Sequence, residues 1–226
     1  MLVVRHALVV ALCMASATTV MAQSAPSASE RAGFNALQQA AHEGDIDTLI
    51  AEVDAGADIE ARDAAGRTPA IIAAFASHDE VVKRLAAAGA DLDALESRAY
   101  DIVTIAAVAD DLAMLDLALE LGADSGQVTS PYDGTALIAA AHLGHHAVVR
   151  SLIEAGAPLD HINNLDWTAL IEAVVLGDGG PDHIETVRAL VDAGADRSIG
   201  DSAGITPLQH ARQRGYAEIV SLLEED

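Results

Sequence analysis

The chain is poor in the residue types that build disulfides and aromatic cores. Cys13 is the single cysteine among 226 residues, which excludes a disulfide framework and cysteine-based zinc sites. Aromatic residues are also few: two phenylalanines, three tyrosines and one tryptophan. Alanine, leucine, isoleucine and valine supply the apolar content instead. Such small side chains suit close helix packing and do not favour a deep aromatic-lined pocket.

Positive charge is scarce as well. Twelve lysine and arginine residues face 35 aspartate and glutamate residues, so the formal net charge is −23, and Lys83 is the one lysine. A surface of this sign repels nucleic-acid phosphates and anionic lipid headgroups. We therefore expect no nucleic-acid partner. A basic protein partner fits this charge, and so does a general role of the acids in solubility.

Long apolar runs are missing except at the N-terminus, where residues 1–22 read MLVVRHALVVALCMASATTVMA. The short apolar stretch and the Val20-Met21-Ala22 ending predict a secretory signal peptide, with an uncleaved anchor as the alternative. Leu12 before Cys13 disfavours a lipoprotein signal. We expect a periplasmic or secreted protein that does not stay in the membrane after cleavage, and a polar, disordered leader over residues 23–33.

A repeat occupies the remainder of the chain. Gly-Ala pairs recur with spacings of 33, 33, 34 and 38 residues, at Gly56, Gly89, Gly122, Gly156 and Gly194. A fixed period of this size is typical of a solenoid. A glycine after an apolar helix ends that helix in the left-handed conformation at little steric cost. Each pair therefore predicts one helix end and one turn per structural unit.

A second landmark keeps the same period and marks helix starts. Thr-Pro or Thr-Ala recurs at Thr68, Thr135, Thr168 and Thr206, with Asp101 and Asn35 in the corresponding places. Threonine caps a helix with its hydroxyl, and proline fits the first helical position. Each landmark predicts a short alanine-rich helix, and a polar break and a second helix with larger apolar residues follow it.

On these motifs the sequence resembles the ankyrin-repeat family over residues 34–226. The fourth unit shows it most clearly, as DGTALIAAAHLGHHAVVRSLIEAGAPLD from Asp133. The resemblance implies an all-α ankyrin-repeat solenoid of about six helix-turn-helix units, joined by β-hairpin-like loops. It departs from the family where the histidine after Thr-Pro-Leu is replaced, by Ile71, Thr104, Ile138, Ile171 and Gln209. The hydrogen bonds of that histidine to the neighbouring loop must then be made otherwise or lost.

No pattern of catalytic or metal-binding residues stands out. His142, His145 and His146 cluster in unit four, but without the partners of a zinc site, and we interpret them as structural. The GDGGPDH segment from Gly177 lacks the ligand spacing of a calcium loop and is interpreted as a flexible insertion. Phosphate-binding, dinucleotide-binding and serine-hydrolase motifs are missing. We expect no enzyme, no metal and no cofactor.

The resemblance implies a partner-binding concave face made of loop tips and first helices. It places Arg67, Tyr100, Trp167 and Ile205 one residue before a helix start, with Tyr132 close to that slot and Phe75 near the end of a first helix. Aromatic residues are enriched at interface centres, so we expect these six residues to bind the partner. The alternative is that they brace neighbouring loops, and for Arg67 that it forms a local ion pair.

Taken together, the sequence predicts an exported, monomeric, non-enzymatic module that binds another protein on its concave face. The alternative is an inhibitor or protective partner of a specific periplasmic enzyme or toxin.

Overall fold

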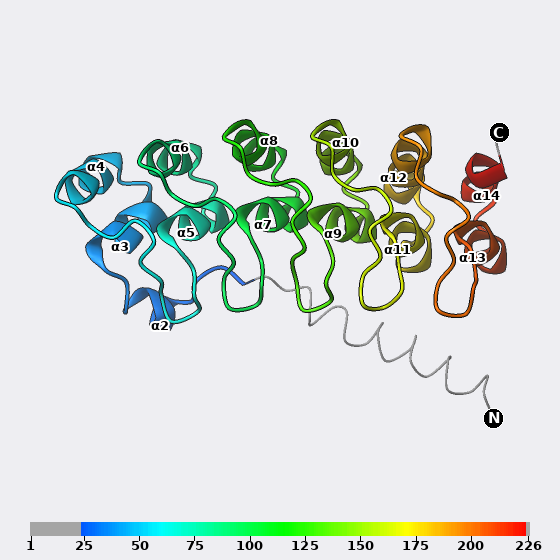
Figure 1. Ribbon diagram of the computed structural model, residues 1–226, viewed down its shortest axis with the longest axis horizontal. Coiled ribbons are helices and arrows are strands. Elements are labelled where there is room, and N and C mark those ends of the chain that lie inside the picture. Colours follow the sequence, from blue (N-terminus) through cyan, green and yellow to red (C-terminus); the bar gives the residue numbers. More distant parts are fainter. Residues whose placement is uncertain (1–23, 225–226) are drawn as a thin grey trace, which may run out of the picture.

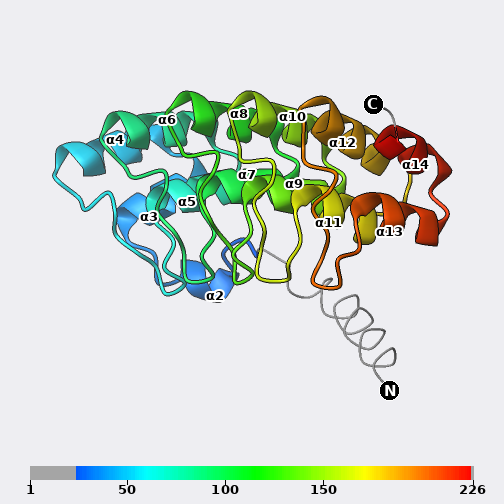
Figure 2. The same cartoon turned by 45° about the vertical axis from the view of Figure 1, so that its right-hand side comes forward.

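The computed structural model describes residues 24–224, so the predicted signal peptide lies outside the described residues. After a short helix α2 (Ala28–Arg31), six helix pairs follow in an elongated row (Figures 1 and 2). The pairs are α3 (Ala36–Glu43) with α4 (Ile46–Asp54), α5 (Pro69–Phe75) with α6 (Asp79–Ala87), α7 (Ile102–Ala109) with α8 (Leu112–Glu120), α9 (Ala136–Leu143) with α10 (His146–Glu154), α11 (Ala169–Val175) with α12 (Pro181–Asp192), and α13 (Pro207–Arg214) with α14 (Ala217–Glu224). The predicted all-α solenoid of six units is confirmed.

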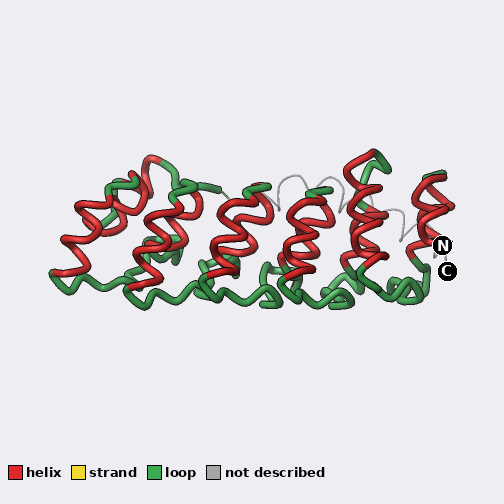
Figure 3. Tube along the Cα trace, turned by 90° about the horizontal axis from the view of Figure 1, so that it is seen from above, coloured by secondary structure: helices red, strands yellow, loops and turns green. Residues whose placement is uncertain are grey.

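The two helices of each pair lie in separate layers. Figure 1 shows α4, α6, α8, α10, α12 and α14 in one row and α3, α5, α7, α9, α11 and α13 in the other, with the long loops projecting beyond the second row. Seen from above, the loops form one continuous edge of the molecule (Figure 3). Within residues 24–224 the loops contain one isolated β-bridge, between Thr129 and Gly134, and no strand.

The predicted capping residues start the first helices. In α5, α9 and α11 the hydroxyls of Thr68, Thr135 and Thr168 each accept a backbone N–H bond from the residue three positions later, at 3.3 Å. Asp101 plays the same part in α7, where its carboxylate accepts the N–H of Thr104 at 2.7 Å. Asn35 and Thr206 do so in α3 and α13. One short motif therefore sets the start of every first helix.

The motif glycines end the second helices as predicted. All five have positive φ angles, from 83° at Gly56 to 99° at Gly122. The amide after each glycine donates to the carbonyl five residues earlier, for example from Ala157 to Leu152 at 2.9 Å. This is the hydrogen bond of a Schellman motif, and a β-carbon at these angles would be strained.

The core runs along the row and is shared between units. The residue seven positions before each motif glycine is fully buried, and this set comprises Leu49, Val82, Leu115, Val149 and Val187. The alanine pairs of the first helices are also buried, so neighbouring helices approach closely. Because each unit covers the apolar face of the next, stability is a sum of unit and interface terms.

Side chains at the altered histidine position still reach the next loop in two units. Gln38 Nε2 donates to the carbonyl of Ala61 at 2.9 Å, and the hydroxyls of Thr104 and Thr129 form a hydrogen bond of 2.9 Å. The expectation that these bonds are made in another way is confirmed at Thr104, and Gln38 makes an equivalent bond from the corresponding position of the first unit.

The leader differs from its prediction. Residues 24–33 have a defined path in the structure: Ser27 and Glu30 form a capping box that starts α2. Glu30 then pairs with Arg67 at 2.7 Å, and the carbonyl of Ser24 accepts a 3.3 Å bond from the same guanidinium. A polar leader that contains proline and serine predicted disorder, whereas the structure gives this segment a short helix and contacts with Arg67.

The insertion of unit five is also more ordered than predicted. Pro181 starts α12, which has 12 residues where the other second helices have eight or nine. Asp178 accepts the N–H of Gly180 at 2.8 Å and faces His183 Nδ1 at 3.0 Å. The extra residues thus build a turn and lengthen the helix.

Candidate functional site

A repeated turn places the predicted contact residues at equivalent points of the loops. In each of four loops a side-chain oxygen accepts the backbone N–H groups two and four residues later, and these acceptors are Asp63, Glu96, Asn163 and Asp201. The residue four positions after the acceptor is Arg67, Tyr100, Trp167 and Ile205 in the four loops, respectively. The predicted equivalence of these four positions is therefore real.

The loop of unit four contains the same side-chain-capped turn, but it is one residue longer. The Ser130 hydroxyl accepts the N–H groups of Tyr132 and Gly134 at 3.3 and 3.4 Å. The backbone of Thr129 pairs with Gly134 five residues on, where the other loops close after four. Gly134 thus takes the place of the aromatic residue, and Tyr132 moves to the tip of the loop.

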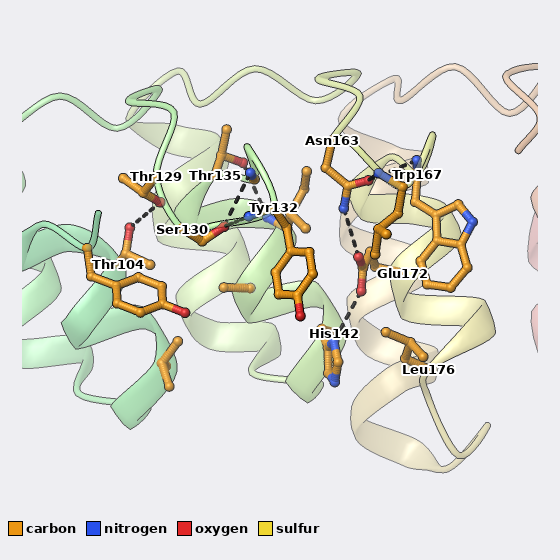
Figure 4. Close-up of a pocket in the computed structure, with 16 residues that line it drawn as sticks. Thr104, Thr129, Ser130, Tyr132, Thr135, His142, Asn163, Trp167, Glu172 and Leu176 are labelled. Carbon is orange, nitrogen blue, oxygen red and sulfur yellow. Dashed lines mark hydrogen bonds and ion pairs between the residues drawn. The ribbon is translucent and has the colours of Figure 1, made fainter. Parts of the chain in front are cut away.

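A hollow opens on this face between units three, four and five. We call it the aromatic slot, because Tyr100, Tyr132 and Trp167 line it (Figure 4). Its cavity volume is about 80 Å³. Apolar side chains complete its walls, namely Val108, Ile138, Ala139, Leu165 and Leu176. The polar groups in it are Thr104, Thr129, Ser130, Thr135, His142, Asn163 and Glu172. Three of the six aromatic residues of the chain therefore meet here, contrary to the expectation from composition.

A polar chain crosses the slot. Asn163 Oδ1 accepts the N–H of Trp167 at 3.1 Å, and Asn163 Nδ2 donates to Glu172 Oε1 at 3.0 Å. The other carboxylate oxygen of Glu172 faces His142 Nδ1 at 3.0 Å. Figure 4 shows this line running from the loop of Trp167 to the end of α9. The network fixes the loop that carries Trp167 against α11 and α9.

The structure distributes the six predicted residues unequally. Tyr132 and Trp167 are partly exposed in the slot, and Tyr100 is 4% exposed at its border. Burial raises the pKa of the Tyr100 hydroxyl. Phe75 lines a second hollow that Tyr100 also borders. Ile205 is partly exposed and lies outside both hollows.

The surroundings of Arg67 favour the second of its two predicted roles, the local ion pair. Its side chain is 4% exposed and bonds Asp63 and Glu30, both at 2.7 Å. Two carboxylates thus occupy the guanidinium, which agrees with the alternative of a local ion pair. The position in the loop is equivalent to that of Trp167, but the leader covers it.

Sequence reasoning missed Glu172 and Asn163. Glu172 is the one charged residue in α11, in which every residue from Ala169 to Val175 is buried. A single acidic residue in such an apolar helix is the sequence signal that could have indicated a functional or structural role for Glu172. Asn163 could not be separated from the other polar loop residues, since its role depends on a contact nine positions away.

Within residues 24–224 no group of three or more histidine, cysteine, aspartate or glutamate side chains is arranged to hold a metal ion. In the same part of the chain, no helix combines the length and apolar character that crossing a membrane requires.

Comparison with known proteins identifies the repeat. Residues 103–199 match the family model for ankyrin repeats in three copies, and residues 65–97 match the single ankyrin repeat. The chain is 34% identical to the ankyrin repeat protein YahD of Escherichia coli (strain K12), over 81% of this chain and 92% of that protein.

Solved structures agree. A crystallised ankyrin repeat domain from Acinetobacter baumannii AYE is 42% identical with a TM-score of 0.79, and the match covers 83% of this chain and 95% of that one. The ankyrin repeat protein EF0377 is 33% identical with a TM-score of 0.78, over 84% and 96% of the two chains. The loops, caps and glycine turns described above are thus those of a known repeat, and the chain belongs to the ankyrin-repeat family of protein–protein interaction modules.

Proposed function

We propose that this chain is exported and binds a partner protein across its concave face, without catalysing a reaction, and that the aromatic slot is the main contact. The observation that carries the proposal is the placement of Tyr132 and Trp167. Both are partly exposed beside an apolar hollow, and they come from the loops of two successive units. Tyrosine and tryptophan at such a place are typical of interface centres.

Capture of partners from the native exported fraction tests the site. Wild-type protein and the variants Trp167→Ala and Tyr132→Ala would be used as baits. Ile50→Ala is the matched control, because Ile50 is an exposed apolar residue on α4, away from the slot. We expect both slot variants to lose a partner that the wild type and the control retain. Equal capture by all four baits would contradict the site.

Export is tested separately. We expect the protein recovered from the periplasm or the medium to begin at Gln23, as shown by N-terminal sequencing. Recovery of the intact N-terminus from the cytoplasm would contradict export while leaving the binding site untouched.

A further inference from the structure

The charges that line the aromatic slot are of one sign. Its sixteen lining residues include one carboxylate, Glu172, one histidine, His142, and no lysine or arginine. The whole chain carries a formal charge of −23. With His142 in its neutral form, a cation meets no repelling group inside the slot and is attracted to the molecule as a whole.

Glu172 has acceptor capacity that the protein does not use. A carboxylate offers about four acceptor positions. His142 and Asn163 each take one, on different oxygens, and the side chain of Glu172 is 5% exposed. A buried carboxylate held by two hydrogen bonds keeps its place, so its remaining lone pairs present a fixed negative pole at the back of the slot.

The aromatic faces around the slot do not cover one another. Within residues 24–224 the close ring pair is Phe34 with His42, outside the slot. Figure 4 shows the rings of Tyr132 and Trp167 standing apart, with Glu172 and Asn163 between them in this view. A cation between aromatic faces gains about 0.5–2 kcal/mol, more as it is desolvated.

From these three observations we propose that the aromatic slot binds an arginine side chain of the partner protein. The planar guanidinium stacks on the faces of Tyr132 and Trp167, and its N–H groups point toward the free acceptor positions of Glu172. Arginine fits better than lysine, because its group is flat, is less strongly hydrated and donates in a fork that suits a carboxylate. The proposal rests on the proposed function and names the chemistry of its partner.

The single tryptophan of the chain reports on the slot, so peptides serve as probes. Blocked peptides Gly-Gly-X-Gly-Gly would be titrated into the protein at constant ionic strength, with X as arginine, citrulline, norleucine or phenylalanine. Trp167 emission and its indole N–H chemical shift measure binding. Citrulline keeps the shape of arginine and removes its charge. We expect the arginine peptide to bind about tenfold more tightly than the citrulline peptide, a difference of about 1.4 kcal/mol.

Variants separate the carboxylate from the rings. Glu172→Gln should weaken arginine binding, because the guanidinium loses its carboxylate partner and keeps only its stacking on the rings, and it should leave citrulline binding unchanged. If this variant fails to fold, Tyr132→Leu tests the same proposal, since Tyr132 is a partly exposed loop residue outside the buried network. We expect it to weaken arginine binding, whereas Ile50→Ala does not.

Equal or tighter binding of the citrulline, norleucine or phenylalanine peptide would overturn the arginine assignment, and so would a lack of response to every peptide. In either case the proposed function still stands if partner capture depends on Trp167. Partner capture that is independent of both Trp167 and Tyr132 would instead remove the proposed site itself.

Discussion

Asp101 starts α7 at the position where four other units use threonine, and it is 1% exposed. Burial raises the pKa of its carboxyl from 3.8 to about 6, although the side-chain and backbone hydrogen bonds with Thr104 act in the opposite direction. The folded protein therefore holds this proton more tightly than the unfolded chain does. The contribution of the protonated Asp101 side chain to the free energy of unfolding is complete below pH 4 and is lost as the pH rises through 6. At neutral pH the buried carboxylate lowers the free energy of unfolding by about 3 kcal/mol relative to its value at low pH.

Replacing the acid while keeping the cap isolates this effect. We predict that Asp101→Thr stabilises the protein at pH 7 by about 1–3 kcal/mol. The difference from the wild type should shrink as the pH falls from 6 to 4. Urea unfolding midpoints measured across that range are the test, and Thr135→Ser serves as a control that alters a cap without altering charge. A difference that does not vary with pH would show that Asp101 is not protonated on folding.

Arg67 is the second residue whose environment decides its role. Removing it leaves the Asp63 carboxylate, whose side chain is 2% exposed, without a counter-charge. We predict that Arg67→Met lowers the free energy of unfolding by about 3–5 kcal/mol. Adding Asp63→Asn should recover part of this loss, since the amide oxygen can still accept the loop N–H groups.

Arg84 provides the matched control for that prediction. It pairs with Glu80 on the surface of α6, where the two side chains are 53% and 52% exposed. Arg84→Met should change stability by less than about 0.5 kcal/mol. If Arg67→Met costs no more than this in denaturant unfolding, the buried Arg67–Asp63 pair does not stabilise the fold.

At the scale of the helices, polar bridges join adjacent units at five junctions. A side chain from the start of a second helix reaches the end of the preceding first helix. The contacts are His78 to His42 O, Asp111 to Ser77 Oγ, His145 to Ala107 O, His183 to His142 O and Tyr216 to Gly177 O. The spacing of the repeat could not reveal these bridges as a set, because histidine makes three of them and Asp111 and Tyr216 make the other two.

Two glycines with similar backbones test the effect of one bridge. Gly144 has φ 75° and Gly156 has φ 86°, but a β-carbon on Gly144 would lie 3.0 Å from the His183 ring, and one on Gly156 would meet nothing within 4 Å. Hydrogen bonds to Asp178 and to the carbonyl of His142 hold that ring in place. We predict that Gly156→Ala costs about 1 kcal/mol from backbone strain and that Gly144→Ala costs roughly 1 kcal/mol more.

A double-mutant cycle with His183→Ala separates the two contributions. In that background the cost of Gly144→Ala should fall to the cost of Gly156→Ala, because the ring is gone. Chemical denaturation of the four proteins of the cycle and of Gly156→Ala provides the measurement. Equal costs of the two alanines in the wild type would mean that the ring moves aside freely.

Across the whole molecule, the turns and caps that recur with the repeat could be predicted from the sequence. Contacts between residues that lie far apart in the sequence could not. Glycine turns and threonine caps are local, so the period revealed six units and their helix ends. The aromatic slot combines side chains of three units, and Glu172 faces it only because α11 packs beside α9. Arg67 shows the same limit, since its partner Glu30 is 37 residues away.

Stacking also brings like charges together along the edge formed by the Gly-Ala-Asp turns. The N–H of Asp91 bonds the Glu60 carboxylate of the preceding unit, and the N–H of Asp124 bonds that of Asp93, both at 2.8 Å. Each hydrogen bond is favourable, but it sets carboxylates of successive units side by side. With a formal charge of −23, folding brings together charges that the unfolded chain keeps farther apart.

We therefore predict that sodium chloride stabilises the fold. The screening length is about 30 Å at 10 mM salt and about 10 Å at 100 mM, so repulsion between neighbouring units weakens most in this range. The free energy of unfolding should rise with salt, while binding of a basic partner should weaken over the same range.

Asp93→Asn is the matched variant: its amide oxygen can still accept the N–H of Asp124, and one charge is removed. It should be more stable than the wild type at low salt and respond less to added salt. A wild-type stability that is flat or falling from 10 to 100 mM would mean that the acidic edge does not oppose folding, and the charge would then act on partners alone.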